Sequence, residues 1–108
     1  MASADSAEQP AAYREVVDAL CADPEVIEGK MMGMPSLKAG RSMFGGTFDG
    51  HLVVKLGRER VAALIAGGRA EPFDPSGRGR PMKDWAQVPE PADDWLALAA
   101  EARALVAT

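Results

Sequence analysis

The chain has 108 residues, of which 47% are hydrophobic and 26% charged, and its formal net charge is -4. This length suits one domain, and the composition is typical of a folded globular protein and not of a disordered or membrane-spanning one. No apolar run approaches the ~18 residues of a membrane span, and the acidic N-terminus lacks the features of a signal peptide. The single cysteine, Cys21, cannot form an internal disulfide. The sequence therefore predicts a cytoplasmic protein that is not bound to a membrane.

Charge is unevenly distributed along the chain. Residues 1–29 hold seven acids and one base, residues 30–83 hold ten bases and four acids, and residues 84–108 hold five acids and one base. One interpretation is internal, with acidic helices lying beside a basic sheet and loop. The other is an anion-binding surface in the middle of the chain. The acidic total argues against tight DNA binding, so direct binding of nucleic acid is not expected.

The first predicted element is a helix over 9–21, after a disordered tail over 1–8. Its apolar residues Tyr13, Val16, Val17 and Leu20 recur at i, i+3, i+4 and i+7, which places them on one face. A three-stranded antiparallel meander then begins near Lys30 and ends near Leu56, with tight turns at Gly40 and Gly50. Pro35 lies in its first strand, and because proline cannot donate to a ladder we expect this strand at a sheet edge or a bulge at Pro35.

The Asp49-Gly50 turn sets the expected register of the meander. As a two-residue turn it pairs Phe48 with His51, Thr47 with Leu52, Gly45 with Val54 and Met43 with Leu56. Met43 then shares the core face with Leu52, Val54 and Leu56, whereas Phe44, Phe48 and Val53 lie on the outer face. A three-residue loop with a bulge would instead turn Phe44 inward, because a slip of one residue reverses every side chain.

The rest of the chain predicts a helix over 57–67, a strand over 69–73, a type I turn over 74–77 and a strand over 81–88. A last helix follows Pro91, with Asp93 and Asp94 capping its first turn and an apolar stripe of Trp95, Leu98, Ala99, Ala102, Leu105 and Val106. The order α-β-β-β-α-β-β-α indicates one α+β domain over 9–108. Its helices are expected to lie on one face of an antiparallel five-stranded sheet, in two layers.

Two segments also carry a family resemblance. MMGMPSLKAGRSMFGGTFDGHLVVKL (31–56) followed by EPFDPSGRGRPMKDWAQVP (71–89) resembles the N-terminal domain of the TfoX/Sxy family. Gly79, Arg80, Pro81, Met82 and Trp85 match its late motif, whereas the Met31-Met32-Gly33 stretch lacks one glycine of the early motif. The resemblance covers residues 9–108 and implies the same two-layer α+β fold. In full-length members of the family the domain belongs to regulators of natural competence and precedes a helical domain. The sequence here ends at Thr108 without such a domain, so we expect a stand-alone bacterial copy of the N-terminal type.

Few residues suit catalysis or metal binding. His51 is the only histidine and Cys21 the only cysteine, and a metal site or a cysteine nucleophile needs more partners than these. The resemblance brings no catalytic residue with it. We therefore expect no enzyme, no metal and no cofactor.

Two surfaces remain as candidate binding sites. Arg69, Arg78, Arg80 and Lys83 cluster around Gly77 and Gly79, an arrangement that suits an anion, unless these cations pair with Glu71, Asp74 and Asp84. Phe44, Phe48 and Val53 would form an apolar patch on the outer sheet face and so an interface, for which a homodimer is one candidate. The sequence thus predicts a small regulatory domain that works through contacts with an unknown protein partner, the alternative being an anion or nucleic-acid binder.

Overall fold

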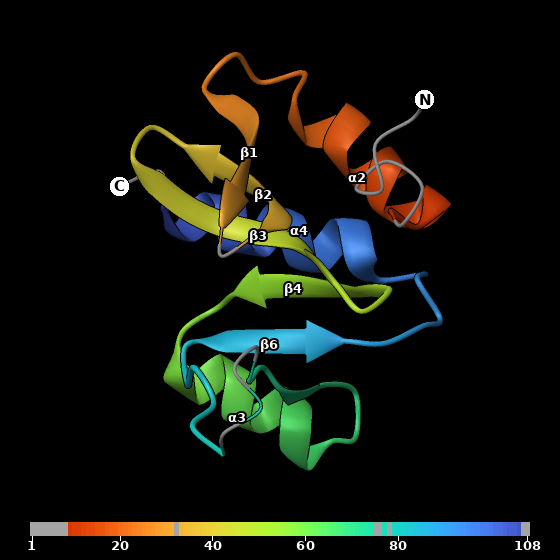
Figure 1. Ribbon diagram of the computed structural model, residues 1–108, viewed down its shortest axis with the longest axis vertical. Coiled ribbons are helices and arrows are strands. Elements are labelled where there is room, and N and C mark those ends of the chain that lie inside the picture. Colours follow the sequence, from red (N-terminus) through yellow and green to blue (C-terminus); the bar gives the residue numbers. More distant parts are fainter. Residues whose placement is uncertain (1–8, 32, 75–76, 78, 107–108) are drawn as a thin grey trace.

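The computed structural model (Figure 1) describes residues 9–31, 33–74, 77 and 79–106, so the predicted tail over 1–8 lies outside the described residues. Three helices pack against a six-stranded antiparallel sheet, which confirms the α+β class but makes the predicted count of five strands wrong. None of the helices in this part of the chain has the length and apolar character of a membrane span. The elements are α2 (Ala11–Leu20), β1 (Val26–Met31), β2 (Met34–Ala39), β3 (Ser42–Phe48), β4 (His51–Lys55), α3 (Arg58–Ala66), β5 (Glu71–Pro72), β6 (Trp85–Val88) and α4 (Trp95–Leu105).

The additional strand is β1, at one end of the sheet order β1-β2-β3-β4-β6-β5. Its sequence, VIEGKM, mixes charged residues and a glycine with few β-formers, so it gave no strand signal of its own. The prediction that Pro35 marks an edge or a bulge is wrong, because β2 lies between β1 and β3. Pro35 pairs with Lys30 of β1, whereas the ladder between β2 and β3 begins only at Ser36. The N–H that proline lacks is therefore not needed for the ladder with β3.

The Asp49-Gly50 turn has the predicted register. Phe48 pairs with His51, Thr47 with Leu52 and Gly45 with Val54, and both turn residues have positive φ. The pairing of Met43 with Leu56 is not formed, because β4 ends at Lys55. Further along β3 the register with β2 shifts, since Leu37 faces Gly45 but Lys38 faces Met43. This bulge leaves Phe44 as the extra residue of β3 and reverses the facing of Phe44 and Met43.

The main core lies between one face of the sheet and the helices. Tyr13, Val16 and Val17 of α2 meet Trp95, Leu98, Ala99 and Ala102 of α4, and these pack on Leu37, Leu52 and Val54 of the sheet. Figure 1 shows α4 behind the sheet with α2 beside it, and α3 beyond β6. The predicted outward facing of Phe44 is wrong: its side chain is 0% exposed and belongs to this core. Met43 packs instead on the opposite face.

A second, smaller core covers the outer face of the sheet. Val53, Phe73, Trp85 and Met34 are buried there, with Met43, Phe48 and Met82 partly buried against them. The rings of Phe48 and Phe73 meet edge to face with centroids 5.6 Å apart, and Phe73 lies 6.1 Å from Trp85. Val53 is 0% exposed and Phe48 is half-buried. The expected apolar patch of Phe44, Phe48 and Val53 is therefore not a surface, because Phe44 lies in the main core and Phe73, Met82 and Trp85 pack over the outer face.

The second half of the chain follows the predicted order with shorter strands. Gly68 has positive φ after α3, and the amide of Gly77 donates to the carbonyl of Asp74 across the predicted turn, whose middle residues 75 and 76 lie outside the described residues. Helix α4 begins at Trp95, and Asp94 makes no side-chain capping bond, so the predicted capping is wrong. Leu105, predicted to be buried, is 52% exposed.

Candidate functional site

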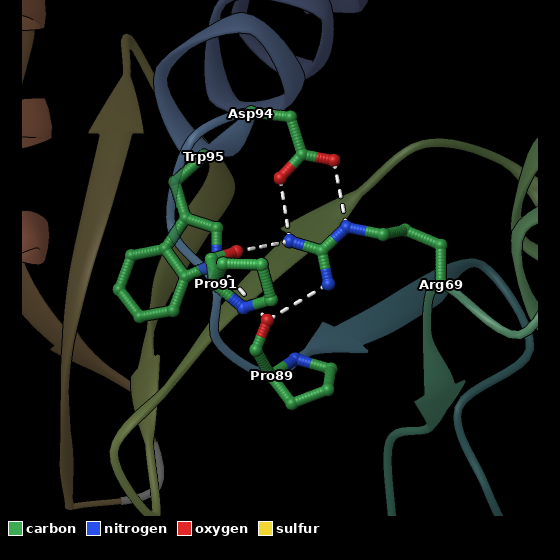
Figure 2. Close-up of polar contacts among 5 residues, drawn as sticks. All are labelled: Arg69, Pro89, Pro91, Asp94 and Trp95. Atoms are coloured by element: carbon green, nitrogen blue, oxygen red, sulfur yellow. Dashed lines mark hydrogen bonds and ion pairs between the residues drawn. The ribbon is translucent and has the colours of Figure 1, made fainter.

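The four predicted anion-binding cations do not form one site. Arg69 lies beyond α3 and turns its guanidinium toward the segment that leads into α4 (Figure 2). Its Nε and Nη2 donate to the two carboxylate oxygens of Asp94, the Nε bond being 2.7 Å long. Its Nη1 and Nη2 also donate to the carbonyls of Pro89 and Pro91, at 2.8 and 2.6 Å. Four of the five N–H donors of Arg69 are occupied in this way, so Arg69 acts as a clamp on residues 89–94 and its guanidinium is already paired with a carboxylate.

The clamp shifts the pKa values of both of its charged residues, Asp94 and Arg69. The hydrogen bond from Arg69 holds the pKa of the Asp94 carboxyl below its ordinary value, and the same bond raises the pKa of Arg69. The indole of Trp95 adds a longer bond, 3.4 Å, to the Pro89 carbonyl. The segment contains a cis peptide bond between Glu90 and Pro91. Arg69, Asp94 and the carbonyls of Pro89 and Pro91 together form the clamp.

The glycine loop already holds an anion, and that anion is a side chain of the protein. The carboxylate of Asp74 accepts hydrogen bonds from the backbone amides of Gly77, Gly79 and Arg80, at 3.1, 2.8 and 3.2 Å. These amides are the groups that an external phosphate would need. Arg78 lies outside the described residues, and the side chain of Arg80 is exposed. The described part of this loop is therefore organised around Asp74.

The fourth cation, Lys83, lies instead on an apolar groove between α3 and the segment before β6. The groove has a volume of about 180 Å³ and is open to solvent along one side. One wall comes from a single stripe of α3, at i, i+3, i+4 and i+7. The other comes from residues flanking the glycine loop. The groove is lined by Arg58, Val61, Ala62, Ile65, Pro72, Pro81, Met82, Lys83 and Trp85.

Backbone hydrogen bonds hold the second wall in place. The amide of Met82 donates to the carbonyl of Phe73, and the amide of Trp85 donates to the carbonyl of Met82. The carbonyl of Asp84 accepts from the amides of both Leu56 and Gly57, directly before α3. Because residues 82–84 are tied to Phe73, directly after β5, on one side and to the start of α3 on the other, the two walls keep a defined separation.

Arg58 and Lys83 place one positive charge on each wall. Four other arginines of the described chain are ion-paired: Arg14 with Glu28, Arg60 with Glu101, Arg69 with Asp94, and Arg103 with Asp23 and Glu25. Across residues 9–31, 33–74, 77 and 79–106, no ion pair joins Arg58 or Lys83 to an acidic side chain. The groove thus offers an apolar floor between two exposed cations.

Arg58 is the first residue of α3, and helix stability does not account for it. A helix N-terminus carries a partial positive charge, so a cation there is opposed by the dipole by about 0.3–1 kcal/mol. Nothing in the described chain neutralises Arg58. A negative charge in the groove mouth would do so.

The two residues considered for chemistry lie apart from the groove. His51 opens β4, where its Nδ1 lies 2.8 Å from the side-chain nitrogen of Gln87. Cys21 directly follows α2, half-buried at the edge of the main core, and burial raises the pKa of its thiol. A raised pKa leaves little thiolate at neutral pH, the opposite of what a nucleophile needs. Among the described residues, no group of three or more His, Cys, Asp or Glu is placed to hold a metal ion.

Sequence reasoning found Lys83 but missed the α3 wall of the groove. Val61 and Ile65 also reach the main core, and the stripe that they form with Arg58 and Ala62 was the available signal. Comparisons with protein-family models, curated proteins and solved structures gave no match, so the fold and the groove are described from this chain alone.

Proposed function

We propose that this chain is a small non-enzymatic interaction domain that binds an acidic peptide segment of a partner protein and takes one bulky apolar side chain of that segment into the groove. The observation that carries the proposal is the apolar floor between two cations that have no acidic partner in the described chain. An acidic peptide supplies both missing components, an apolar group to fill the floor and carboxylates to face Arg58 and Lys83.

The size of the groove favours a side chain over a free metabolite. Small-molecule sites usually enclose about 300–1,000 Å³, whereas this groove encloses about 180 Å³. Burial of one side chain contributes about 1.5–3 kcal/mol, and each exposed charge pair about 0.2–1 kcal/mol. These contributions sum to at most about 5 kcal/mol, and the cost of association reduces the sum further, so we expect a dissociation constant on the order of 1 mM or weaker, which suits a regulatory contact.

The family type, the regulatory role and the location expected from the sequence are part of the same proposal. Membership of the TfoX N-terminal type, a regulatory role and a cytoplasmic location are consistent with a binding domain. The homodimer also remains a proposal, and since Phe44 and Val53 are buried, the open edge of β1 is the surface that supports it. Nucleic-acid binding has less support, because Arg69 and the glycine-loop amides are bound within the chain.

The proposal can be tested by NMR titration with short acidic peptides that carry a central Phe, Leu or Trp. We expect shifts confined to the amides of α3 and residues 82–85, and we expect salt to weaken the binding because exposed charges are screened. Control peptides replace the apolar residue by Ser, or the acids by Lys, and should give no shifts.

Three outcomes would contradict the proposal. The absence of groove shifts with every acidic peptide at millimolar concentration would exclude the groove as a peptide site. Groove shifts caused by hexanoate but by none of the peptides would identify a small-anion site instead. Shifts of the same amides caused by a short DNA duplex alone would favour nucleic-acid binding.

A further inference from the structure

Strand β1 is the last strand at one end of the sheet, and the charges along it, Glu28 and Lys30, are complementary to those of a second copy of the same strand. We propose that two copies of the chain associate by antiparallel pairing of β1 with β1, about a two-fold axis at Gly29. This pairing places Glu28 of each copy opposite Lys30 of the other. It gives a geometry to the self-association proposed above, and it does not depend on the groove, which lies at the opposite end of the sheet order.

Pro35 reveals which residues of β1 face the open edge. It lies opposite Lys30, and because proline has no N–H, this pair is a non-hydrogen-bonded pair of the β1–β2 ladder. Bonding alternates along an antiparallel strand, so residues 27, 29 and 31 bond to β2, and residues 26 and 28 direct their backbone groups to the other side. The amide of Val26 agrees with this alternation, because it donates to the carbonyl of Asp23 and not to β2.

Alternation restricts the registers open to a symmetric pair. Both residues of a hydrogen-bonded pair must face the open edge, so even-numbered residues must meet even-numbered residues. A two-fold axis at position 28 would place Glu28 opposite Glu28, and one at position 30 would place Lys30 opposite Lys30; both juxtapositions are unfavourable. An axis at Ile27 leaves a shorter overlap and no opposite charges. The axis at Gly29 alone brings acid opposite base, twice.

The side chains of β1 are suited to this register. Glu28 lies on the α2 side, within 2.8 Å of Arg14, and remains half exposed, so it can face a second cation. On the other side Ile27 is 47% exposed, one of the large apolar residues that the described chain leaves in solvent. Gly29 has no side chain to obstruct the axis. Pairing would cover Ile27 and would continue the sheet across both copies.

One pair of short strands buries less than the ~1,200 Å² of a standard interface, so the dimer should be weak and concentration-dependent. Sedimentation velocity of the whole chain should show monomer at low micromolar concentration and dimer at high concentration. Glu28→Lys and Lys30→Glu, taken singly, should each weaken association about tenfold, because each creates two like-charge pairs. The double variant should restore it, since the pairs are then reversed and again complementary. Circular dichroism would establish that each variant is folded.

A cysteine placed at the axis gives an independent readout. In a Cys21→Ala background, Gly29→Cys places two thiols across a non-hydrogen-bonded pair, whose Cα separation of about 4.5 Å is within the range of disulfides. A Cβ at this position meets only the Ser36 hydroxyl, at 3.7 Å, so the variant should fold. We expect rapid covalent dimerisation for Gly29→Cys and little for Lys30→Cys.

Several results would overturn the inference. A strict monomer at millimolar concentration excludes it, as does a double charge swap that associates no better than the single variants. Equal cross-linking of Gly29→Cys and Lys30→Cys would indicate contact without this register. None of these results affects the groove, whose peptide titration is carried out at concentrations where the monomer dominates.

Discussion

Arg58 begins α3 and Arg69 follows the turn after that helix, yet the two arginines differ in the groups that surround them. Arg69 bonds to the Asp94 carboxylate and to two carbonyls, and it fixes the entry to α4. Arg58 stands on an apolar groove with no acidic partner among the described residues. The role of a cation therefore depends on the groups that its donors reach, and not on how many cations lie nearby in sequence.

The largest expected contrast between the two arginines is in stability. Arg69→Ala removes four hydrogen bonds and should lower the free energy of unfolding by about 2 kcal/mol, measured by urea denaturation. Arg69→Lys should recover only part of this loss, because an ammonium lacks the planar fork that reaches carboxylate and carbonyls together. Arg41→Ala, at an exposed turn, is the matched control and should change stability by less than about 0.5 kcal/mol. An Arg69→Ala variant as stable as this control would show that the clamp does not hold α4.

Acid should weaken the clamp and leave the groove walls intact. Because the folded pKa of Asp94 lies below its unfolded value near 3.8, the ion pair stabilises the protein above that pH. The contribution disappears as the pH falls through the folded pKa. The Asp94 side chain is 41% exposed, so solvent screening limits the effect to about 1 kcal/mol.

The difference in unfolding free energy between the wild type and the Asp94→Asn variant, measured across this pH range, should therefore shrink toward acid. Asp93→Asn alters the neighbouring carboxyl without removing a hydrogen bond to Arg69, and it serves as the control. If the difference between the wild type and Asp94→Asn stayed constant with pH, the acid sensitivity could not be assigned to this ion pair.

The smallest stability effect is expected at Arg58, with the opposite sign. Arg58→Glu places an acid at the first position of α3, where the dipole favours it, and should stabilise the protein by about 0.5 kcal/mol. The same change should weaken binding of the acidic peptides about tenfold, because one attractive charge becomes repulsive. Arg41→Glu should leave the affinity unchanged. If Arg58→Glu destabilised the protein as Arg69→Ala is expected to, Arg58 would be a structural residue.

Local turn chemistry allowed much of the fold to be predicted from the sequence. Asp49-Gly50 specified the register of β3 and β4, since a two-residue turn with positive φ leaves one pairing. It did not determine the facing of Phe44, because the bulge arises from pairing with β2 and not from the turn. Strand β1 was missed for a related reason: VIEGKM has little strand propensity, and its pairing with β2 holds it in the sheet.

The candidate site was less predictable, because each of its features depends on contacts between distant segments. Arg69 reaches Asp94 only after the chain has passed through β6, and no local pattern indicates that pairing. The aromatic cover of Val53 comes from Phe73 and Trp85, which are far along the chain. By contrast, the spacing of Arg58, Val61, Ala62 and Ile65 is local and could have indicated the groove wall.

Two alanines on α3 provide the sharpest test of the groove as the binding site. Both Ala62 and Ala63 are exposed, but only Ala62 lines the groove, so Ala62→Phe fills it while Ala63→Phe adds the same surface elsewhere. In titrations with the acidic Phe-containing peptide, we expect Ala62→Phe to lose at least about tenfold in affinity and Ala63→Phe to bind as the wild type does. Equal affinity of the two folded variants would mean that the peptide does not bind in the groove.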